Sequence, residues 1–261
     1  MSRAHPVRPA ITHPQRHLCS VLHITLEIVG SWICYHQLRP PLPHQTPPKM
    51  DSEDVEASKM FITYNNIHQL CQETSAKIKE FKPDLIIAIG GGGFIPARML
   101  RTFLKEPGQP NIRIMAVILS LYEDVSTVGS QVEVVGTQVV RTQWIDYAQS
   151  KIDLVNKNVL IIDEVDDTRT TLHYAVSELK KDVAEQAAAQ GADPNSTKFG
   201  IFVLHDKVKE KRALLPEDIM KDLYFAARTV PDCWIAYPWE STDIVYHTKK
   251  AMEQGNDTFL P

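Results

Sequence analysis

The stretch from Val159 to Leu172 holds the residue types in this chain that could do chemistry. Four apolar residues, 159–162, lead into the adjacent carboxylates Asp163 and Glu164. A short apolar run of this kind predicts a strand buried on both faces, and in an open parallel sheet ligands bind at the carboxyl edge. Carboxylates at that edge can hold sugar hydroxyls, or a hydrated Mg²⁺ that in turn holds pyrophosphate.

The residues after these acids suit a phosphate. A helix is predicted from about Thr170 to Gln190, and a helix start offers unpaired N–H groups at the positive end of its dipole. Hydroxyl groups and a cation surround this start: Thr168, Arg169, Thr170 and Thr171. A functional interpretation is a sugar-phosphate site between strand and helix, and the plain alternative is a helix cap.

This arrangement resembles the motif that binds phosphoribosyl pyrophosphate (PRPP) in type I phosphoribosyltransferases: an apolar strand, two acids and a small loop. The resemblance implies that Asp163 and Glu164 hold the ribose 2′ and 3′ hydroxyls, partly through metal. It implies that the loop from Asp167 to Thr171, with Asp166 before it, binds PRPP and cradles its 5′-phosphate. Asp167 matches the aspartate that faces N7 of the base in purine-specific members, which makes it the candidate catalytic residue.

Arg169 departs from the family pattern, which usually has Gly at this position. Glycine tolerates positive φ and lets a phosphate approach the backbone closely. Either Arg169 reaches a compatible backbone conformation or the loop differs slightly, and the sequence leaves both possibilities open.

A glycine run, Gly90–Gly93, follows the apolar residues 85–89. It has neither the spacing of a dinucleotide-binding loop nor the Lys of a P-loop. The family resemblance implies that Gly90, Gly91 and Gly92 contact pyrophosphate through backbone N–H groups, with a cis peptide between Gly90 and Gly91. The plain alternative is a tight turn.

The segment from Trp234 to Glu240 carries the second resemblance, to the base-binding segment of the 6-oxopurine members. It implies that Trp234 stacks on the purine, since a flat aromatic gives a base large contact area. It also implies that Ile235 offers backbone groups to the purine edge and that Glu240 lies near the metal or the 2-amino edge. The alternative is an aromatic core strand. Lys207 follows the fourth predicted strand, where a lysine could donate to the purine 6-oxo group or be merely solvated.

Ser120 and Tyr122 begin a long stretch with few helical cues. Such a connection inside a compact domain is often a lid. In the family it is a mobile flap that excludes water from the reacting carbon, here at about 121–144. A surface hairpin is the alternative.

Strands are predicted at 85–89, 112–119, 159–162 and 199–204, with helices between them. A first helix has Ile67, Leu70, Cys71, Ile78 and Phe81 at helical spacing, capped by Asn65 or Asn66. The fold class is α/β with a parallel sheet. By resemblance it is the type I phosphoribosyltransferase fold, with a core at about 82–205, a flap, and a small hood from about 60–81 and 206–261.

Residues 1–59 are rich in Pro and His, and we expect a disordered leader. It would be a targeting or docking segment, or else a floppy tail or upstream sequence that is not in the mature protein. The net charge of −4 provides no general field for nucleic acid, and no apolar run reaches bilayer length. Four cysteines without zinc-site spacing favour a reduced, cytoplasmic protein.

From Phe61 to about Thr258 the chain most resembles the fungal hypoxanthine-guanine members of the family. The resemblance implies a Mg²⁺-dependent purine salvage enzyme, forming a homodimer, that converts PRPP and hypoxanthine or guanine into IMP or GMP and pyrophosphate. Two alternatives stay open: a xanthine phosphoribosyltransferase, and a non-catalytic PRPP-sensing regulator on the same fold. Lys207 favours a 6-oxo over a 6-amino purine, because a lysine is only a donor.

Overall fold

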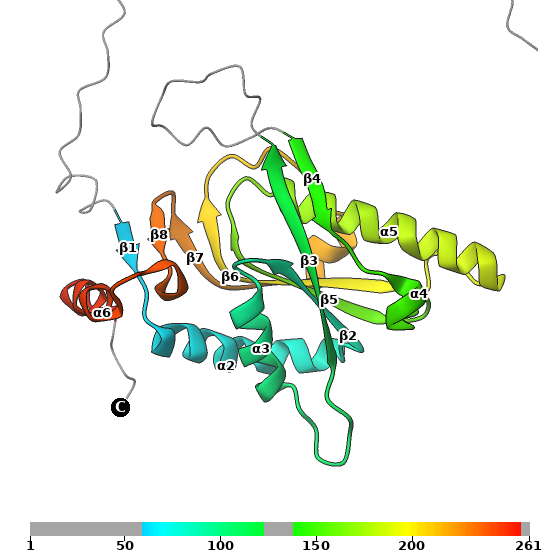
Figure 1. Cartoon of the computed structure of the whole chain (residues 1–261), viewed down its shortest axis with the longest axis horizontal. Helices are drawn as coiled ribbons and strands as arrows, with labels where there is room; N and C mark the ends of the chain where they lie inside the picture. Colours follow the sequence, from blue (N-terminus) through cyan, green and yellow to red (C-terminus); the bar gives the residue numbers. More distant parts are fainter. Residues whose placement is uncertain (1–58, 123–137, 257–261) are drawn as a thin grey trace, which may run out of the picture. The chain divides into compact units, whose positions relative to one another are not determined.

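The computed structural model describes residues 59–122 and 138–256 (Figure 1). Residues 1–58 of the predicted leader and 123–137 of the predicted flap lie outside these ranges. The main sheet has six strands in the order β4-β3-β2-β5-β6-β7. All neighbouring strands are parallel except β3 and β4, which are antiparallel. The predicted α/β class with a mainly parallel sheet is therefore confirmed. The strands are β2 (Leu85–Gly90), β3 (Arg113–Tyr122), β4 (Gln138–Gln143), β5 (Asn158–Asp166), β6 (Lys198–Val208) and β7 (Tyr224–Pro231).

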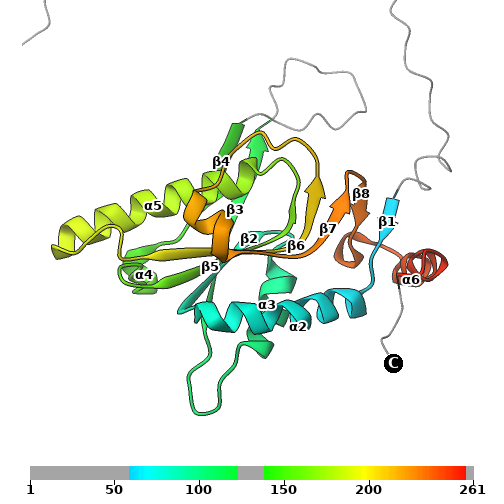
Figure 2. The same cartoon turned by 180° about the vertical axis from the view of Figure 1, so that it is seen from behind.

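Helices cover both faces of this sheet (Figures 1 and 2). On one face lie α2 (Tyr64–Phe81) and α3 (Phe94–Phe103), and on the other lies α5 (Thr170–Gln190). Strand β2 serves both sides: Ile86 packs with α2 and α3, while Ile87 packs with α5. Successive strand side chains point to opposite faces, so the continuous apolar runs of the sequence are what a sheet covered twice requires.

A separate two-stranded parallel sheet joins β1 (Lys59–Phe61) to β8 (Trp234–Ala236). It brings the start of the described chain beside the predicted base-binding segment. Helix α6 (Ile244–Glu253) is anchored directly after β1, because His247 Nε2 lies 2.9 Å from the backbone oxygen of Ile62. The short elements are α4 (Tyr147–Ser150), the π-helix Ile219–Leu223 and the 3₁₀ turn Pro238–Glu240.

Helix α2 buries all five residues that its sequence pattern placed on one face. Its cap differs from the prediction of Asn65 or Asn66. Thr63 is the N-cap, and its hydroxyl accepts a hydrogen bond from Asn66 N at 3.2 Å while Asn66 Oδ1 accepts from Thr63 N. This reciprocal capping box uses Asn66 as the third helical residue, a role that its residue type alone does not distinguish from an N-cap.

Strands β5 and β6 extend well beyond their apolar runs into polar residues. Strand β5 continues through Asp166, and β6 continues through Val208, with Val165 opposite His205 and Asp166 opposite Asp206. The acids and Lys207 therefore lie on the strand ends rather than after them. The ladder persists because backbone pairing between parallel neighbours does not depend on side-chain polarity.

Strands β3 and β4 form the antiparallel base of the segment predicted as a flap, with Ser120 opposite Val140. In the described residues Cys71 and Cys233 are both unpaired thiols, as predicted, while Cys19 and Cys34 lie outside them. Within 59–122 and 138–256 no helix has both the length and the apolar character needed to span a membrane.

Candidate active site

A cavity of about 260 Å³ lies at the carboxyl edge of β2 and β5, where the sequence predicted a sugar-phosphate site. It brings together the glycine loop, the adjacent acids and the turn that leads into α5. We call residues 166–171 the phosphate turn. The predicted residues that line the cavity are Gly90, Gly91, Gly92, Asp163, Glu164, Asp166, Asp167, Thr168, Arg169 and Thr171.

The glycine loop fits closely around Glu164. A Cβ atom on Gly92 would lie 1.9 Å from Glu164 Cδ, so any side chain at Gly92 would displace this carboxylate. A Cβ on Gly93 would meet backbone oxygens of β2 and β5 at 2.6 and 2.3 Å. The Gly90–Gly91 peptide is cis, as the family resemblance implied. The loop thus needs glycine to pack against the acids.

Glu164 accepts hydrogen bonds from two aromatic side chains and lies near another negative charge. Trp239 Nε1 donates to Glu164 Oε2 at 3.0 Å, and the hydroxyl of Tyr237 donates to the Glu164 carbonyl at 3.2 Å. Burial, followed by the charge of Glu240, raises the pKa of Glu164 to about 7. Burial and the Glu164 charge also raise the pKa of Asp163. These carboxylates are therefore arranged so that a cation would stabilise their charged forms.

The acids fit a hard cation, although they form no complete cage. Among the described residues, no group of three or more His, Cys, Asp or Glu side chains is arranged to hold a metal by itself. Mg²⁺ commonly keeps several waters and binds through one or two carboxylates plus substrate phosphates. The adjacent carboxylates Asp163 and Glu164 would hold the ion in such a shared site, and the charge of Glu240 lies near Glu164.

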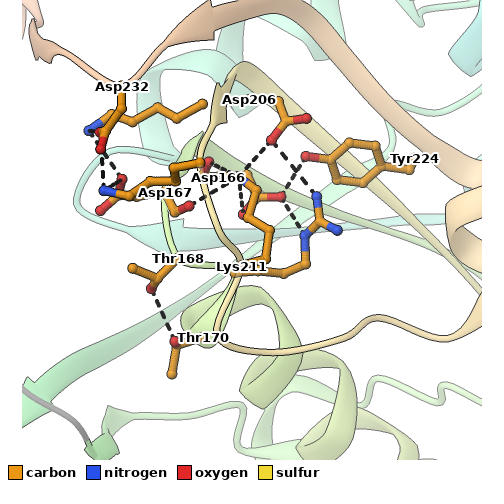
Figure 3. Close-up of polar contacts among 11 residues, drawn as sticks. Asp166, Asp167, Thr168, Thr170, Asp206, Lys211, Tyr224 and Asp232 are labelled. Atoms are coloured by element: carbon orange, nitrogen blue, oxygen red, sulfur yellow. Dashed lines mark hydrogen bonds and ion pairs between the residues drawn. The ribbon is translucent and has the colours of Figure 1, made fainter.

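Asp167 lies between two lysines. Its Oδ1 is 3.2 Å from Lys207 Nζ and 3.0 Å from Lys209 Nζ, and Asp232 Oδ1 is 3.9 and 3.1 Å from the same nitrogens. Burial acts to raise the pKa of Asp167, but the hydrogen bonds and charges of Lys209 and Lys207 lower it overall. Asp167 is therefore a carboxylate with lysine donors at the edge of the cavity (Figure 3).

The predicted base-binding segment contacts the acidic strand end through residues on both sides of Trp234. Before it, Asp232 pairs with the lysines that contact Asp167, and after it, Trp239 contacts Glu164. Trp234 itself is 54% exposed, whereas Ile235 is buried in the core. An indole this exposed on the short strand β8 is not a core residue, so the alternative of a buried aromatic strand fails for Trp234.

Arg169 occupies the left-handed region, with φ 68° and ψ −2°, directly before α5. The backbone therefore takes the conformation for which family members use Gly. Its side chain runs back to Asp166, where Nε donates to Oδ2 at 2.8 Å, and its guanidinium lies 5.3 Å from the ring centre of Tyr224. The Asp166 side chain is fully buried. Next to it, the hydroxyls of Thr168 and Thr170 are 3.0 Å apart.

Several residues around the cavity were missed by the sequence reasoning. Lys209 and Lys211 alternate with Lys207, and this run of lysines was a visible signal of a basic cluster. Both lie beyond Val208, where β6 ends, so the period of a strand does not place them. Asp206, Tyr224 and Tyr237 had no comparable local pattern, because their partners lie far away in the chain. Of the predicted flap pair, Ser120 Oγ is 2.9 Å from Thr142 Oγ1, and the side chain of Tyr122 lies outside the described residues.

The fold and this site define a phosphoribosyltransferase. The family model described as "Phosphoribosyl transferase domain" matches residues 62–220, more than half of the chain, and the chain belongs to this family. The hypoxanthine-guanine phosphoribosyltransferase of Saccharomyces cerevisiae is 70% identical over 210 residues, covering 78% of this chain and 95% of that protein.

Two further relatives match this chain at lower identities, which are almost equal to each other. The hypoxanthine-guanine phosphoribosyltransferase of Schizosaccharomyces pombe is 54% identical over 77% of this chain and 98% of its own length. Xanthine phosphoribosyltransferase 1 of S. cerevisiae is 53% identical over 78% of this chain and 100% of its own length.

Among solved structures, a hypothetical protein from Neisseria gonorrhoeae with bound ppGpp has a TM-score of 0.57 and 38% identity, covering 76% of this chain and 97% of that one. The purine phosphoribosyltransferase of Pyrococcus horikoshii has a TM-score of 0.50 and 25% identity, covering 71% and 96%.

Proposed function

We propose that the chain is a purine salvage transferase that converts PRPP and hypoxanthine or guanine into pyrophosphate and IMP or GMP. The observation that carries the proposal is the convergence of Asp163, Glu164, the glycine loop and the phosphate turn on one cavity. The 70% identity to a yeast hypoxanthine-guanine phosphoribosyltransferase supports this choice of base.

In this proposal the cavity binds PRPP. Asp163 and Glu164 hold the ribose hydroxyls, and the phosphate turn holds the 5′-phosphate at the start of α5. Gly90–Gly92 contact pyrophosphate through their backbone. A Mg²⁺ ion bound near Asp163, Glu164 and Glu240 would supply charge neutralisation for the departing pyrophosphate.

The purine would occupy the side of the cavity toward β8. Trp234 stacks on the ring, backbone groups of Ile235 meet its edge, and Lys207 donates to the 6-oxo group. Purine N9 then forms a bond to ribose C1 as the bond from C1 to pyrophosphate breaks, and Asp167 accepts the proton from N7. Holding N9 and C1 in line supplies much of the acceleration.

The test is nucleotide formation by the purified chain with PRPP, Mg²⁺ and each of adenine, hypoxanthine, guanine and xanthine. IMP and GMP are the expected products. Preferential formation of XMP would instead establish a xanthine phosphoribosyltransferase, which the 53% identity to the yeast xanthine enzyme makes the second candidate. Binding of PRPP without any nucleotide product would favour the non-catalytic regulator.

We further propose a homodimer in the cytoplasm, and a flap that begins with Ser120 and Tyr122 and closes during catalysis. Light scattering of the purified chain tests the dimer, and fluorescence microscopy of a tagged chain tests the location. Replacement of Tyr122 by Ala tests the flap, with kcat expected to fall because water exclusion is lost.

A further inference from the structure

Two side chains of the phosphate turn and three from outside it form a network that we call the ionic brace: Asp166, Arg169, Asp206, Lys211 and Tyr224 (Figure 3). Asp166 Oδ2 accepts from Arg169 Nε at 2.8 Å and from the Tyr224 hydroxyl at 2.6 Å. Lys211 Nζ is 2.8 Å from Asp206 Oδ1 and 3.4 Å from Asp166 Oδ1. Two cations thus face two carboxylates, so the network carries no net buried charge.

The segment that follows β6 also holds the backbone of the phosphate turn. Lys211 Nζ donates to the carbonyl oxygens of Asp166 at 2.7 Å and of Asp167 at 3.0 Å. The N–H of Arg212 donates to the carbonyl of Thr168 at 3.0 Å. Three successive carbonyls of the turn therefore point toward residues 211–212.

The direction of these carbonyl groups also fixes the direction of the N–H groups in the turn. In a trans peptide the C=O of one residue and the N–H of the next point in opposite directions. With the carbonyls of residues 166–168 directed toward 211–212, the N–H groups of residues 167–169 point away from that segment. Residues 167–169 also line the cavity, so these N–H groups are available to an anion bound there.

We propose that the side chains of Lys211 and Arg169 are positioning groups, which fix the phosphate turn through the ionic brace without themselves contacting the substrate. Lys211 holds the carbonyl groups of Asp166 and Asp167 by hydrogen bonds. The hydrogen bond between Arg169 and Asp166 stabilises the left-handed backbone of Arg169, a conformation that is unfavourable for L-residues. This inference rests on the proposed function, because it concerns the affinity of the same site for PRPP.

The central test compares Lys211→Met with the wild-type chain. Methionine keeps the unbranched stem and removes the charge and the donors. We expect the KM for PRPP to rise about tenfold, while the KM for the purine changes by less than about twofold, because only the phosphate side is misplaced. Lys181→Met is the matched control: Lys181 is exposed on α5 and pairs with Glu178, and its KM values are expected to stay at wild-type levels.

Arg169→Gly and Arg169→Ala distinguish the effect of losing the guanidinium from the effect of straining the left-handed backbone. Both remove the guanidinium, but glycine accepts positive φ freely and alanine does not. We expect a raised KM for PRPP in both, with the lower melting temperature in the alanine variant. Tyr224→Phe removes only one donor to Asp166 and keeps the test available if Lys211→Met does not fold.

A double-mutant cycle with Asp206→Asn distinguishes positioning from direct contact. If Lys211 acts through the brace, Asp206→Asn raises the KM for PRPP as well, and the two changes together are less than additive. If Lys211 instead touches PRPP, Asp206→Asn leaves that KM unchanged or lowers it, and the proposal is wrong. It is equally wrong if Lys211→Met and Arg169→Gly lower the melting temperature and leave the KM for PRPP at the wild-type value. Failure of the wild-type chain to use PRPP is a different result, which refutes the proposed function.

Discussion

The two sides of the candidate active site are built differently. The phosphate turn is held from beneath by the ionic brace, and the Asp166 side chain at its centre is fully buried. The side proposed to bind the purine consists of an exposed Trp234 and of ion pairs of lysines that lie partly in solvent. A rigid phosphate turn suits a sugar phosphate that is the same in every reaction of the family, and an open purine side suits a base that differs between family members. Relatives named for different bases, at 70% identity for a hypoxanthine-guanine enzyme and 53% for a xanthine enzyme, agree with this division.

The strongest test of the purine side is Asp167→Asn, for which we expect the largest effect on rate. Asparagine keeps the shape but cannot accept the N7 proton, so kcat should fall about 100-fold or more. The KM for PRPP should change little, because the phosphate turn keeps its brace. Steady-state kinetics with guanine and PRPP measure both values.

Asp232→Asn is the matched control, because Asp232 lies near the same two lysines. It should reduce kcat far less than Asp167→Asn does. An Asp167→Asn enzyme with wild-type kcat would exclude the proton-acceptor role.

His205 tests the connection between the two sides. It is 2% exposed, and its Nδ1 lies 2.8 Å from the Tyr237 hydroxyl, which also contacts the Glu164 carbonyl. Burial, followed by the charge of Arg228, lowers the pKa of His205 to about 4, so the unfolded chain binds more protons between about pH 4 and 6.5. Stability from His205 is present above about pH 6.5 and is lost as the pH falls toward 4, by up to about 3 kcal/mol.

The pH dependence of stability contributed by Glu164 has the opposite sign to that of His205, so the two groups can be compared in one measurement. Its pKa is raised to about 7, so the unfolded chain releases its proton first and stability falls as the pH rises from about 4.5 to 7. Between about pH 4.5 and 6.5 the two groups act in opposite directions, so the stability of the wild-type chain should change little there. In thermal unfolding between pH 4.5 and 7.5, the stability of His205→Gln should fall as the pH rises from 4.5 to 7, and that of Glu164→Gln should fall as the pH drops below about 6.5. Parallel profiles for the wild-type chain and His205→Gln would contradict the buried neutral imidazole.

A structural feature of this molecule can be predicted from the sequence when the residues that cause it are neighbours in the chain. The strand 159–162, the helix from Thr170 to Gln190 and the cis peptide at Gly90–Gly91 follow from runs of neighbouring residues or from the family resemblance. The conformation of Arg169 could not be decided in that way. Its left-handed backbone is stabilised by Asp166 and by Tyr224, and Tyr224 comes from a strand more than fifty residues later.

The same distinction explains why the acids were placed after a strand rather than on it. The apolar run ends at Ile162, but the ladder between β5 and β6 continues to Asp166 because the neighbouring strand also continues. Strand length is thus a property of the pair, and one segment read alone underestimates it. The roles of the individual site residues remain predictions for the experiments described.

Trp234→Ala tests the open side with a smaller expected effect. Base stacking on an aromatic side chain contributes about 1–3 kcal/mol, so the KM for hypoxanthine or guanine should rise about tenfold. The KM for PRPP and the melting temperature should stay near wild type, because Trp234 is 54% exposed and substitutions at such sites usually change stability by less than about 0.5 kcal/mol. Loss of folded protein would instead make Trp234 a structural residue.

The smallest effect is expected from Lys209→Met, and it concerns pH rather than rate at the optimum. Lys209 is the nearer of the two lysines to Asp167 and lowers its pKa, which keeps the carboxylate ionised as the pH falls. Without Lys209, the acid limb of kcat/KM should move upward by up to about one pH unit. Asp232→Asn should not move that limb upward, because it leaves both lysines to Asp167. An upward movement in both variants would mean that the limb reports a group other than Asp167, and the purine side would then lack its proposed proton acceptor.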